Sequence, residues 1–314
     1  FIMKSNKPIV IIAGPTASGK SSFAIELAKL LNGTIINFDS MQVYSDLSIL
    51  TARPNENDLS LVPHKLYGFI SGSVRCTSIF WRNQAVKEIK KVFSIDRVPI
   101  LVGGTGLYIK TLIDGITDIP ASLTKYTNKA ENLYKEIGNK NFHNLVKKID
   151  PIIAEKIEIN DYQRLIRAYT VWMQTKKTLS EWQKNDSMSK KIYNNFLKIK
   201  LVPERKYLRE NIKNRFIEMI DAGVIDEVKS ISKYDMSLPI MKAHGLREIL
   251  EYIEGKKQLN TVVEEATNQI NQYAKRQDTW FRNKYNSQYD IVDVQKDISD
   301  NCSNILSLYH DMYK

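Results

Sequence analysis

Short apolar runs alternate with segments of helical periodicity along the first third of the chain. Residues 8–13 and 98–102 are continuous apolar runs rich in β-branched residues, and 34–38 is a shorter run of the same kind. Such runs are typical of strands that are buried on both faces of a sheet. Apolar residues at helical spacing predict helices at 22–31 and 78–93. This alternation predicts an α/β fold around a parallel sheet.

The pattern changes near residue 120, where a polar, lysine-dense and helix-rich segment begins. We expect this segment to be an all-helical domain inserted into the α/β core. A strand pattern then returns at 196–202. Helices are predicted after it, at 207–220, 226–234, 241–253 and 264–283. We therefore divide the chain into the first part of the core, the helical insertion and a mostly helical completion of the core, at residues 1–119, 120–198 and 199–314.

One motif lies between the first predicted strand and the first predicted helix. Residues 14–21 satisfy Gly-x-x-x-x-Gly-Lys-Ser/Thr, the phosphate-binding P-loop, so a P-loop NTPase-like core is predicted. The glycines allow a tight turn whose backbone amides, with the helix N-terminus, bind phosphate oxygens. Lys20 brings a positive charge to the phosphates, and the Ser21 hydroxyl can bind Mg²⁺. The flanking strand and helix favour a phosphate site over a chance glycine-rich turn, formed by Gly14, Pro15, Thr16, Ala17, Ser18, Gly19, Lys20 and Ser21.

Two further predicted strands end in residues of chemical interest. Asp39 comes directly after the second strand, where α/β folds bind ligands. General base, Mg²⁺ ligand and helix cap are the three roles open to it. The strand at 98–102 ends in Gly103-Gly104-Thr105-Gly106, and not in the acidic residue of a common P-loop ATPase. This turn either lets another chain or a nucleotide approach its backbone closely or is only a tight turn.

A predicted helix in the insertion carries long polar side chains. Asp161 caps this helix, and Gln163 and Arg167 lie one turn apart on one face of it, while Leu165 can face inward. Paired donors of this kind suit phosphates or base edges of a nucleic acid. A solvated surface is the alternative interpretation.

The last long helix ends in a basic cluster. Lys275, Arg276 and Arg282 surround the aromatic residue Trp280 there, a combination that suits a nucleic acid. The 314-residue chain also carries a formal net charge of +11, which favours a polyanionic partner. A well-solvated, lysine-rich surface explains the charge equally well.

Composition excludes several classes of protein. Hydrophobic residues make up 43% and charged residues 26% of the chain, which is ordinary for a globular protein. The two cysteines, Cys76 and Cys302, lie far apart, without metal-ligand spacing or a disulfide framework. No apolar run approaches transmembrane length, and residues 1–4 lack the apolar region of a signal peptide. We therefore expect a cytoplasmic protein that does not associate with membranes.

Six motifs, taken in order, resemble those of one enzyme family. Over nearly its whole length the chain resembles the bacterial tRNA dimethylallyltransferases, also called tRNA isopentenyltransferases. A P-loop alone is weakly specific, but together with the second and the last of these motifs it is highly specific. The motifs are residues 14–21, Asp39-Ser40-Met41-Gln42-Val43-Tyr44, Gly103-Gly104-Thr105-Gly106-Leu107-Tyr108, Gln163-Arg164, Arg215-Phe216 and Lys275-Arg276-Gln277-x-Thr279-Trp280-Phe281-Arg282.

The resemblance implies an activity and its partners. A dimethylallyl group would pass from dimethylallyl diphosphate to the exocyclic amine of the adenine next to the tRNA anticodon (position 37), with release of diphosphate. The adenine would be flipped out of its stack to react. The tRNAs implied are those that read codons beginning with U, and the helical insertion would grip the anticodon stem-loop. The enzyme implied is a monomer that uses Mg²⁺.

Individual roles follow from the same resemblance. Asp39 matches the general base that takes a proton from the amine, and Arg215 matches an arginine that contacts the diphosphate. Lys20, Ser21 and Mg²⁺ would complete the neutralisation of the leaving diphosphate. The residues implied to contact tRNA are Asp39, Ser40, Met41, Gln42, Thr105, Gln163, Arg164, Leu165, Ile166, Arg167, Lys275, Arg276, Gln277, Thr279, Trp280 and Arg282.

A few positions depart from the family pattern. Leu50 stands where glycine is usual, and Arg53 replaces a lysine. Asn37-Phe38 stand where a small residue and alanine are commoner, and His244 interrupts the usual Ala-(Ile/Leu)-Gly. None of these changes removes a catalytic group.

Two other functions remain open from the residues alone. A P-loop kinase that phosphorylates a small metabolite with ATP shares the loop, Mg²⁺ and Asp39, but leaves the basic helix and the insertion unexplained. A non-catalytic RNA-binding protein that uses a nucleotide as a switch accounts for the charge, but gives Asp39 and Arg215 no role.

Overall fold

The computed structural model describes residues 6–115, 117, 119–184, 191, 193–293 and 298–313. They form two compact units, and the second unit, Asp114–Lys191, interrupts the first in sequence. The predicted boundary of the insertion at residue 198 is wrong. Phe196–Leu201 forms a strand of the main sheet, so the core resumes before that residue.

The first unit contains a sheet and the helices that surround it. Its elements in chain order are β1 (Ile9–Ala13), α1 (Lys20–Leu30), β2 (Gly33–Asn37), α2 (Glu56–Leu61), β3 (His64–Lys65), α3 (Ser78–Ser94), β4 (Val98–Gly103), α4 (Gly106–Ile113), β5 (Phe196–Leu201), α9 (Arg205–Asp221), α10 (Val224–Ser230), the 3₁₀ helix η1 (Pro239–Lys242), α11 (Leu246–Ile253), α12 (Leu259–Lys284), β6 (Tyr289–Ile291) and α13 (Ile298–Tyr313). Within the part of the chain that the structure describes, no helix combines the length and the apolar character needed to cross a membrane.

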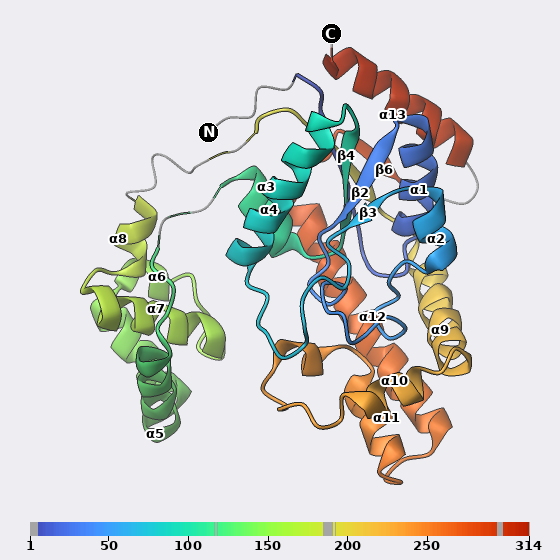
Figure 1. The fold of residues 1–314 in the computed structure, drawn as a ribbon. Coiled ribbons are helices and arrows are strands. Elements are labelled where there is room, and N and C mark those ends of the chain that lie inside the picture. Colours follow the sequence, from blue (N-terminus) through green and yellow to red (C-terminus); the bar gives the residue numbers. More distant parts are fainter. Residues whose placement is uncertain are drawn as a thin grey trace. The chain divides into compact units, whose positions relative to one another are not determined.

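The strands of the sheet pair in parallel, in the order β3-β2-β4-β1-β5-β6. The central strand β1 places Ile11 opposite Leu101 of β4 on one side and opposite Lys198 of β5 on the other. Every residue of β1, β2 and β4 is buried, as expected for strands covered on both faces. Helices lie on both sides of the sheet in Figure 1. The predicted α/β fold with a parallel sheet is confirmed.

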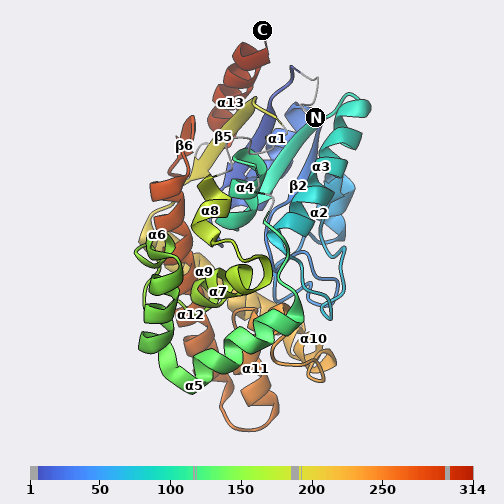
Figure 2. The same ribbon diagram turned by 90° about the vertical axis from the view of Figure 1, so that its left-hand side faces the viewer.

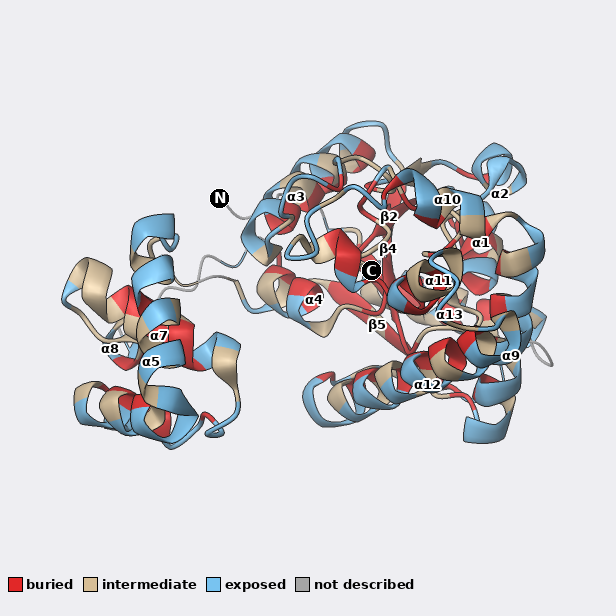
Figure 3. Cartoon of the chain, turned by 90° about the horizontal axis from the view of Figure 1, so that it is seen from below, coloured by how far each residue is buried: buried red, intermediate tan, exposed pale blue. Residues whose placement is uncertain are grey.

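Alternate residues of β1 belong to two hydrophobic cores, one on each face of the sheet. Ile9 and Ile11 pack with side chains of α3, α4, α9 and α12, whereas Val10 and Ile12 pack with α1 and α13. The two-residue period of a strand explains this division. Figures 1 and 2 show α13 beside α1, and Figure 3 shows the buried residues on the sheet and on the inward faces of the helices.

Two helix predictions differ from the structure at their ends. Leu30, an apolar residue of the helix predicted at 22–31, is 56% exposed and ends α1, whereas Leu31 is buried just after it. The helix predicted from residue 241 begins only at Leu246. Gly245 before it adopts φ 87°, and a residue in this left-handed conformation interrupts a right-handed helix.

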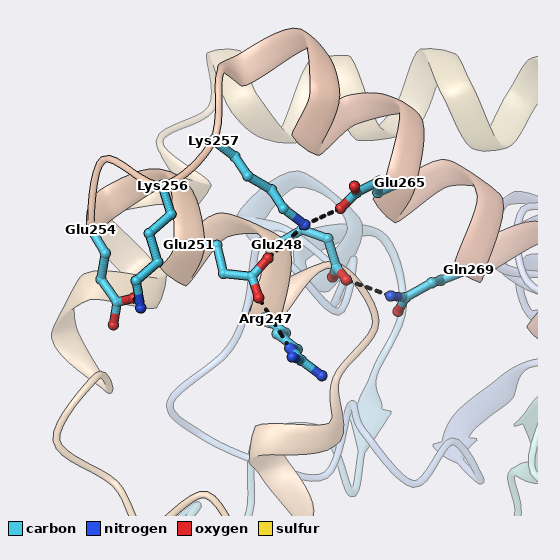
Figure 4. Close-up of polar contacts among 8 residues, drawn as sticks. All are labelled: Arg247, Glu248, Glu251, Glu254, Lys256, Lys257, Glu265 and Gln269. Carbon is cyan, nitrogen blue, oxygen red and sulfur yellow. Dashed lines mark hydrogen bonds and ion pairs between the residues drawn. The ribbon is translucent and has the colours of Figure 1, made fainter.

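Polar side chains join α11 to α12 (Figure 4). Lys257, between the two helices, pairs with Glu251 of α11 at 2.6 Å and also with Glu265 of α12. All three side chains keep contact with solvent, so water screens these ion pairs and weakens them. Gln269 of α12 also donates to the side chain of Glu248 of α11, which is buried. Because a buried carboxylate is costly without a partner, this contact fixes α12 against α11.

The second unit consists of helices in the residues that the structure describes. They are α5 (Thr124–Ile149), α6 (Pro151–Ala154), α7 (Tyr162–Thr175) and α8 (Leu179–Lys184). Asp161 caps α7 by accepting from the Arg164 backbone N–H at 3.3 Å, as the sequence predicts. The core of this unit packs Phe142 of α5 against Leu165 and Ile166 of α7.

Candidate active site

The P-loop connects the end of β1 to the start of α1. Helix α1 begins at Lys20, and Gly19 before it adopts φ 86°, a conformation that favours glycine. The Lys20 ammonium folds back over the loop and donates to the Pro15 carbonyl at 2.5 Å and to the Ser18 hydroxyl at 3.4 Å. The cation is therefore held over the concave side of the loop, where a phosphate would bind.

A cavity of about 690 Å³ lies against this loop. Its lining includes Lys20, Ser21, Asp39 and Arg215, so the four residues predicted to be catalytic share one cavity. Burial, and to a lesser extent the Arg215 charge, lowers the pKa of Lys20 to about 7, against the opposing effect of Asp39. Burial also lowers the pKa of Arg215, and Asp39 opposes this shift too. Two poorly hydrated cations in one cavity favour an anionic ligand.

Gln277 of α12 joins the P-loop to the glycine-rich turn after β4. Its side-chain oxygen accepts from the Thr16 backbone N–H at 2.8 Å, and its side-chain nitrogen donates to the Gly104 carbonyl at 2.9 Å. A Cβ on Gly104 would lie 2.2 Å from that nitrogen, and one on Gly106 would lie 2.4 Å from the Trp280 ring. The glycines therefore let α12, a segment of the same chain, pack directly against the turn.

Helix α9 supports the P-loop as well. Arg215 donates to the Thr16 hydroxyl at 2.6 Å, and Asn211, one turn earlier on α9, donates to the Ala17 carbonyl at 3.3 Å. Ala17 itself adopts φ 60°, which costs energy for a residue with a side chain. Contacts from α9 and α12 therefore hold a loop conformation that its own glycines do not determine alone.

Asp39 is fixed in place from both sides along the chain. Its Oδ1 accepts from the backbone N–H of Met41 at 2.9 Å and of Gln42 at 3.4 Å, so it does cap the following turn. Asn37, which is fully buried, accepts from the Asp39 N–H at 2.8 Å and donates to the Asp39 carbonyl at 3.1 Å. The cap leaves the second carboxylate oxygen for another role, and Asp39 borders the cavity at the P-loop.

The residues after Asp39 bond to neighbouring loops. The Thr105 hydroxyl accepts from the Ser40 backbone N–H at 2.9 Å and ties the glycine-rich turn to this segment. The Gln42 side chain donates to the carbonyls of Thr51 and Ala52 at 2.9 and 2.8 Å. Gln42, Thr51 and Ala52 line the cavity at the P-loop, so the Gln42 side chain helps to build its wall.

A second, smaller cavity of about 70 Å³ adjoins the first at Asp39. Thr16, Asp39, Thr51 and Arg215 line both cavities. Beyond these shared residues the walls are mostly apolar, with two polar rings, and they are formed by Met41, Leu50, Ile212, Phe216, Met219, Ala243, His244, Ile270 and Tyr273. A cationic cavity and an apolar one thus meet at a carboxylate.

Comparison with known families decides what kind of protein has this site. A family model described as IPP transferase matches residues 42–284, and one described as isopentenyl transferase matches residues 7–73. The chain belongs to the IPP transferase family. Its resemblance to that family, predicted from the motifs, is confirmed.

Individual relatives align with most of the chain. The tRNA dimethylallyltransferase of Gluconobacter oxydans is 40% identical over 88% of this IPP transferase and 83% of the relative. The solved full-length tRNA isopentenylpyrophosphate transferase of Bacillus halodurans is 32% identical with a TM-score of 0.69, and each chain is covered to 98%. A eukaryotic dimethylallyltransferase solved acting on tRNA is 26% identical with a TM-score of 0.82, over 97% of this chain and 79% of the other.

Many residues that the sequence assigns to tRNA contact are accessible in this IPP transferase. On α12, Lys275, Arg276, Thr279 and Arg282 are exposed, and the Trp280 ring is partly covered by the glycine-rich turn. In the second unit, Gln163 and Arg164 of α7 are exposed. Arg167 is half-buried, and it donates to the Pro120 carbonyl at 3.1 Å and to the Ser122 hydroxyl, so part of its bonding capacity is used within the unit.

Three assignments to tRNA contact are corrected by burial. Leu165 and Ile166 of α7 lie in the core of the second unit, because apolar residues at this spacing face the other helices. Gln277 is only 5% exposed, and its amide group is occupied by Thr16 and Gly104. The side chains of these three residues support the structure and are not on its surface.

Several residues of the site were not predicted from the sequence. Met219 of α9 lines the smaller cavity with Arg215, and so does Phe216, which the sequence named only as part of a motif and gave no role. Met219 lies one helical turn after Arg215, and this spacing was a signal that could have found it. Asn37, a buried polar residue at a strand end, was a weaker signal. No local signal marks Tyr273, whose pKa is raised by burial and by the Asp39 charge.

The structure shows the contacts of three residues that depart from the family pattern, Arg53, His244 and Leu50. Arg53 donates to the Tyr44 carbonyl at 3.1 Å, so this cation holds a loop together. The His244 ring packs against Tyr273 with centroids 4.4 Å apart. Burial, and the nearby charge of Arg276, lower the pKa of His244. Leu50 and His244 line the same small cavity.

Proposed function

We propose that this protein is a tRNA dimethylallyltransferase, which moves a dimethylallyl group from dimethylallyl diphosphate to the exocyclic amine of adenine 37 of tRNA. The observation that carries this proposal is the junction of two cavities at Asp39. The cationic cavity at the P-loop suits a diphosphate, and the apolar cavity suits a short branched hydrocarbon. The names of the relatives and solved structures support the same activity.

The charged residues have distinct roles in this transfer. The amine nitrogen bonds to the allylic carbon as the bond from that carbon to the diphosphate oxygen breaks, and diphosphate leaves with the electron pair. Lys20 and Arg215 neutralise the charge that develops on the diphosphate. The proton lost by the amine passes to the Asp39 carboxylate, which borders both cavities.

Mg²⁺ fits the residues present at the P-loop. The Ser21 hydroxyl and the Asp39 carboxylate line the same cavity as Lys20, and Mg²⁺ in such sites takes most of its ligands from phosphate oxygens and water. Among the described residues, no group of three or more His, Cys, Asp or Glu could hold a metal by itself. Ser21 is therefore the side chain that we propose as a ligand. Bound there, the ion would add positive charge beside the leaving diphosphate.

The exposed basic residues of α12 and of the second unit are proposed to bind the anticodon stem-loop. Lys275 and Arg276 lie on α12 and directly precede Gln277, which reaches the P-loop and the glycine-rich turn. Phosphate contacts of this kind position the nucleic acid without reading its sequence. We propose tRNAs that read codons beginning with U as substrates, and a monomer as the active form.

Label incorporation into unmodified tRNA tests the proposed activity. Labelled dimethylallyl diphosphate and γ-labelled ATP are compared in the presence of Mg²⁺. Incorporation from the diphosphate alone, lost when the adenine next to the anticodon is changed, is the expected result. Turnover of ATP on a metabolite mixture without prenyl transfer would favour a small-molecule kinase instead. Tight tRNA binding with neither activity would favour a non-catalytic RNA-binding protein.

Binding of dimethylallyl diphosphate without tRNA is expected to take up close to one proton at pH 8. With a pKa of about 7, Lys20 is mostly neutral at that pH in the free protein. Phosphate oxygens beside the ammonium favour its charged form and raise its pKa, so the lysine takes up a proton on binding. Calorimetric titrations in two buffers with different ionisation enthalpies measure this number. Lys20→Arg, which stays charged, is the matched control, and a heat independent of buffer for the unchanged protein contradicts the prediction.

Replacing Lys275 with alanine is expected to weaken tRNA binding. The slope of log Kd against the logarithm of the salt concentration should also fall by about one. Lys275 is exposed and borders surface hollows along α12. Arg282 belongs to the same basic cluster, but it already pairs with both carboxylate oxygens of Asp278 at 2.9 Å. Its replacement should therefore change the salt slope less.

Filter binding over a series of salt concentrations measures both effects. Lys91→Ala, which removes an exposed lysine of α3, is the control for general loss of charge. A salt slope that is the same for Lys275→Ala and for the unchanged protein would exclude a phosphate contact at Lys275.

A further inference from the structure

Leu50 occupies an unusual position in the smaller cavity. It lies on the loop after Asp39, outside the helices α9 and α12 that supply part of the other walls, and it is only 7% exposed. With Phe216 and Met219 of α9 it forms apolar lining of the cavity of about 70 Å³ that adjoins Asp39. The cavity therefore combines walls built from packed helices with apolar side chains from loops, among them Leu50.

Glu227 of α10 holds this loop through its backbone. One carboxylate oxygen accepts from the N–H groups of Ser48 and Ile49 at 2.5 and 2.7 Å, and the other accepts from the N–H of Leu50 at 2.8 Å. The same carboxylate also accepts from the Ser48 hydroxyl at 2.8 Å. Bonds from charged acceptors are among the strong ones, so the backbone that carries Leu50 is firmly placed.

The size of the cavity limits what it can hold. Its volume of about 70 Å³ is far smaller than the about 690 Å³ of the adjoining cavity at the P-loop. A space of this size suits a short branched hydrocarbon better than a ten-carbon chain. Where the family pattern has glycine at this position, the present chain adds a leucine side chain to the wall.

We propose that Leu50 is a specificity-determining residue that limits the length of the hydrocarbon chain on the donor diphosphate. This inference rests on the proposed function, because it assigns the apolar cavity to the hydrocarbon of the donor. Phe216 and Met219 contribute to the same wall and belong, like Leu50, to the hydrophobic core of the first unit, but they lie on helix α9. Leu50 lies on a loop, and it stands where the family pattern has glycine, so its side chain can be shortened without removing a contact within a helix.

Competition between two donors tests the proposal. Leu50→Ala and Leu50→Gly are assayed with dimethylallyl and geranyl diphosphate, and the measured quantity is the ratio of kcat/KM for geranyl to that for dimethylallyl. We expect this ratio to rise by at least about tenfold, since single methylene changes in an apolar pocket shift rates by that factor or more. Leu59→Ala is the matched control, because Leu59 of α2 is 49% exposed, and it should leave the ratio unchanged.

The opposite change provides a second test that does not depend on opening the cavity. Leu50→Phe should raise KM for dimethylallyl diphosphate about tenfold or more and leave inhibition by inorganic diphosphate unchanged, because diphosphate lacks the hydrocarbon. If Leu50→Ala keeps dimethylallyl transfer and does not change the donor ratio, the proposal is overturned while the proposed function stands. If the unchanged protein transfers no dimethylallyl group, the proposed function fails, and this proposal with it.

Discussion

Transfer to tRNA is expected to fall by about two to four orders of magnitude when Asp39 is replaced by asparagine, with little change in tRNA affinity. Asparagine keeps an oxygen that can accept from the Met41 backbone N–H, so the turn that Asp39 caps should survive. It removes the basic carboxylate at the junction of the two cavities. The adenine amine then has no protein group at that point to receive its proton. Single-turnover transfer assays and separate tRNA-binding measurements check the two parts of this result.

Comparison with alanine at the same position separates chemistry from structure. Asp39→Ala removes the cap as well as the base. It should therefore lose activity, and its free energy of unfolding should also fall by about 0.5–2 kcal/mol. Full turnover by Asp39→Asn would exclude Asp39 as the general base. Loss of tRNA binding equal to the loss of transfer would indicate that Asp39 acts mainly in recognition.

Lys20→Met is expected to reduce transfer by about two to three orders of magnitude, through weaker stabilisation of the leaving diphosphate. Methionine keeps most of the length of the side chain but has no charge to place over the P-loop. Because burial already makes the Lys20 charge costly in the free protein, its removal should not destabilise the fold. The observable is therefore a loss of turnover, and of affinity for diphosphate, at unchanged melting temperature.

A lysine on the same helix provides the control for Lys20. Lys29 lies in α1, pairs with Glu26 at 2.8 Å on the surface and does not line the P-loop cavity. Lys29→Met should leave both turnover and inhibition by diphosphate unchanged. Equal activity of Lys20→Met and Lys29→Met would show that the Lys20 charge takes no part in the reaction.

Features encoded in short segments were predicted well from the sequence. The β-branched run of β1, the glycines of the P-loop and the period of α1 follow one another directly, so they specify strand, loop and helix without reference to the rest of the chain. In α7, periodicity alone correctly placed Leu165 inward. The resemblance to a family motif suggested tRNA contact for the same residue, because a motif records positions and not the directions of side chains.

Contacts between distant segments could not be predicted in this way. Glu227 bonds to the Ile49 N–H across 178 positions of sequence, and nothing near either residue indicates the other. Gln277 was assigned to tRNA because it lies in a basic motif, whereas the fold turns it toward the P-loop. A polar residue within an exposed basic stretch has the same local pattern whether it faces solvent or the protein.

The dependence of the P-loop on α12 has a consequence for synthesis of the protein. Gln277 follows the residue that it supports by 261 positions, so the loop leaves the ribosome long before its support has been made. At roughly 5–20 residues per second, the interval is on the order of ten to fifty seconds. During that time the nascent chain carries the phosphate-binding motif without the contacts that fix its shape. Fragments that end before α12 should therefore compete poorly with the finished enzyme for cellular diphosphates.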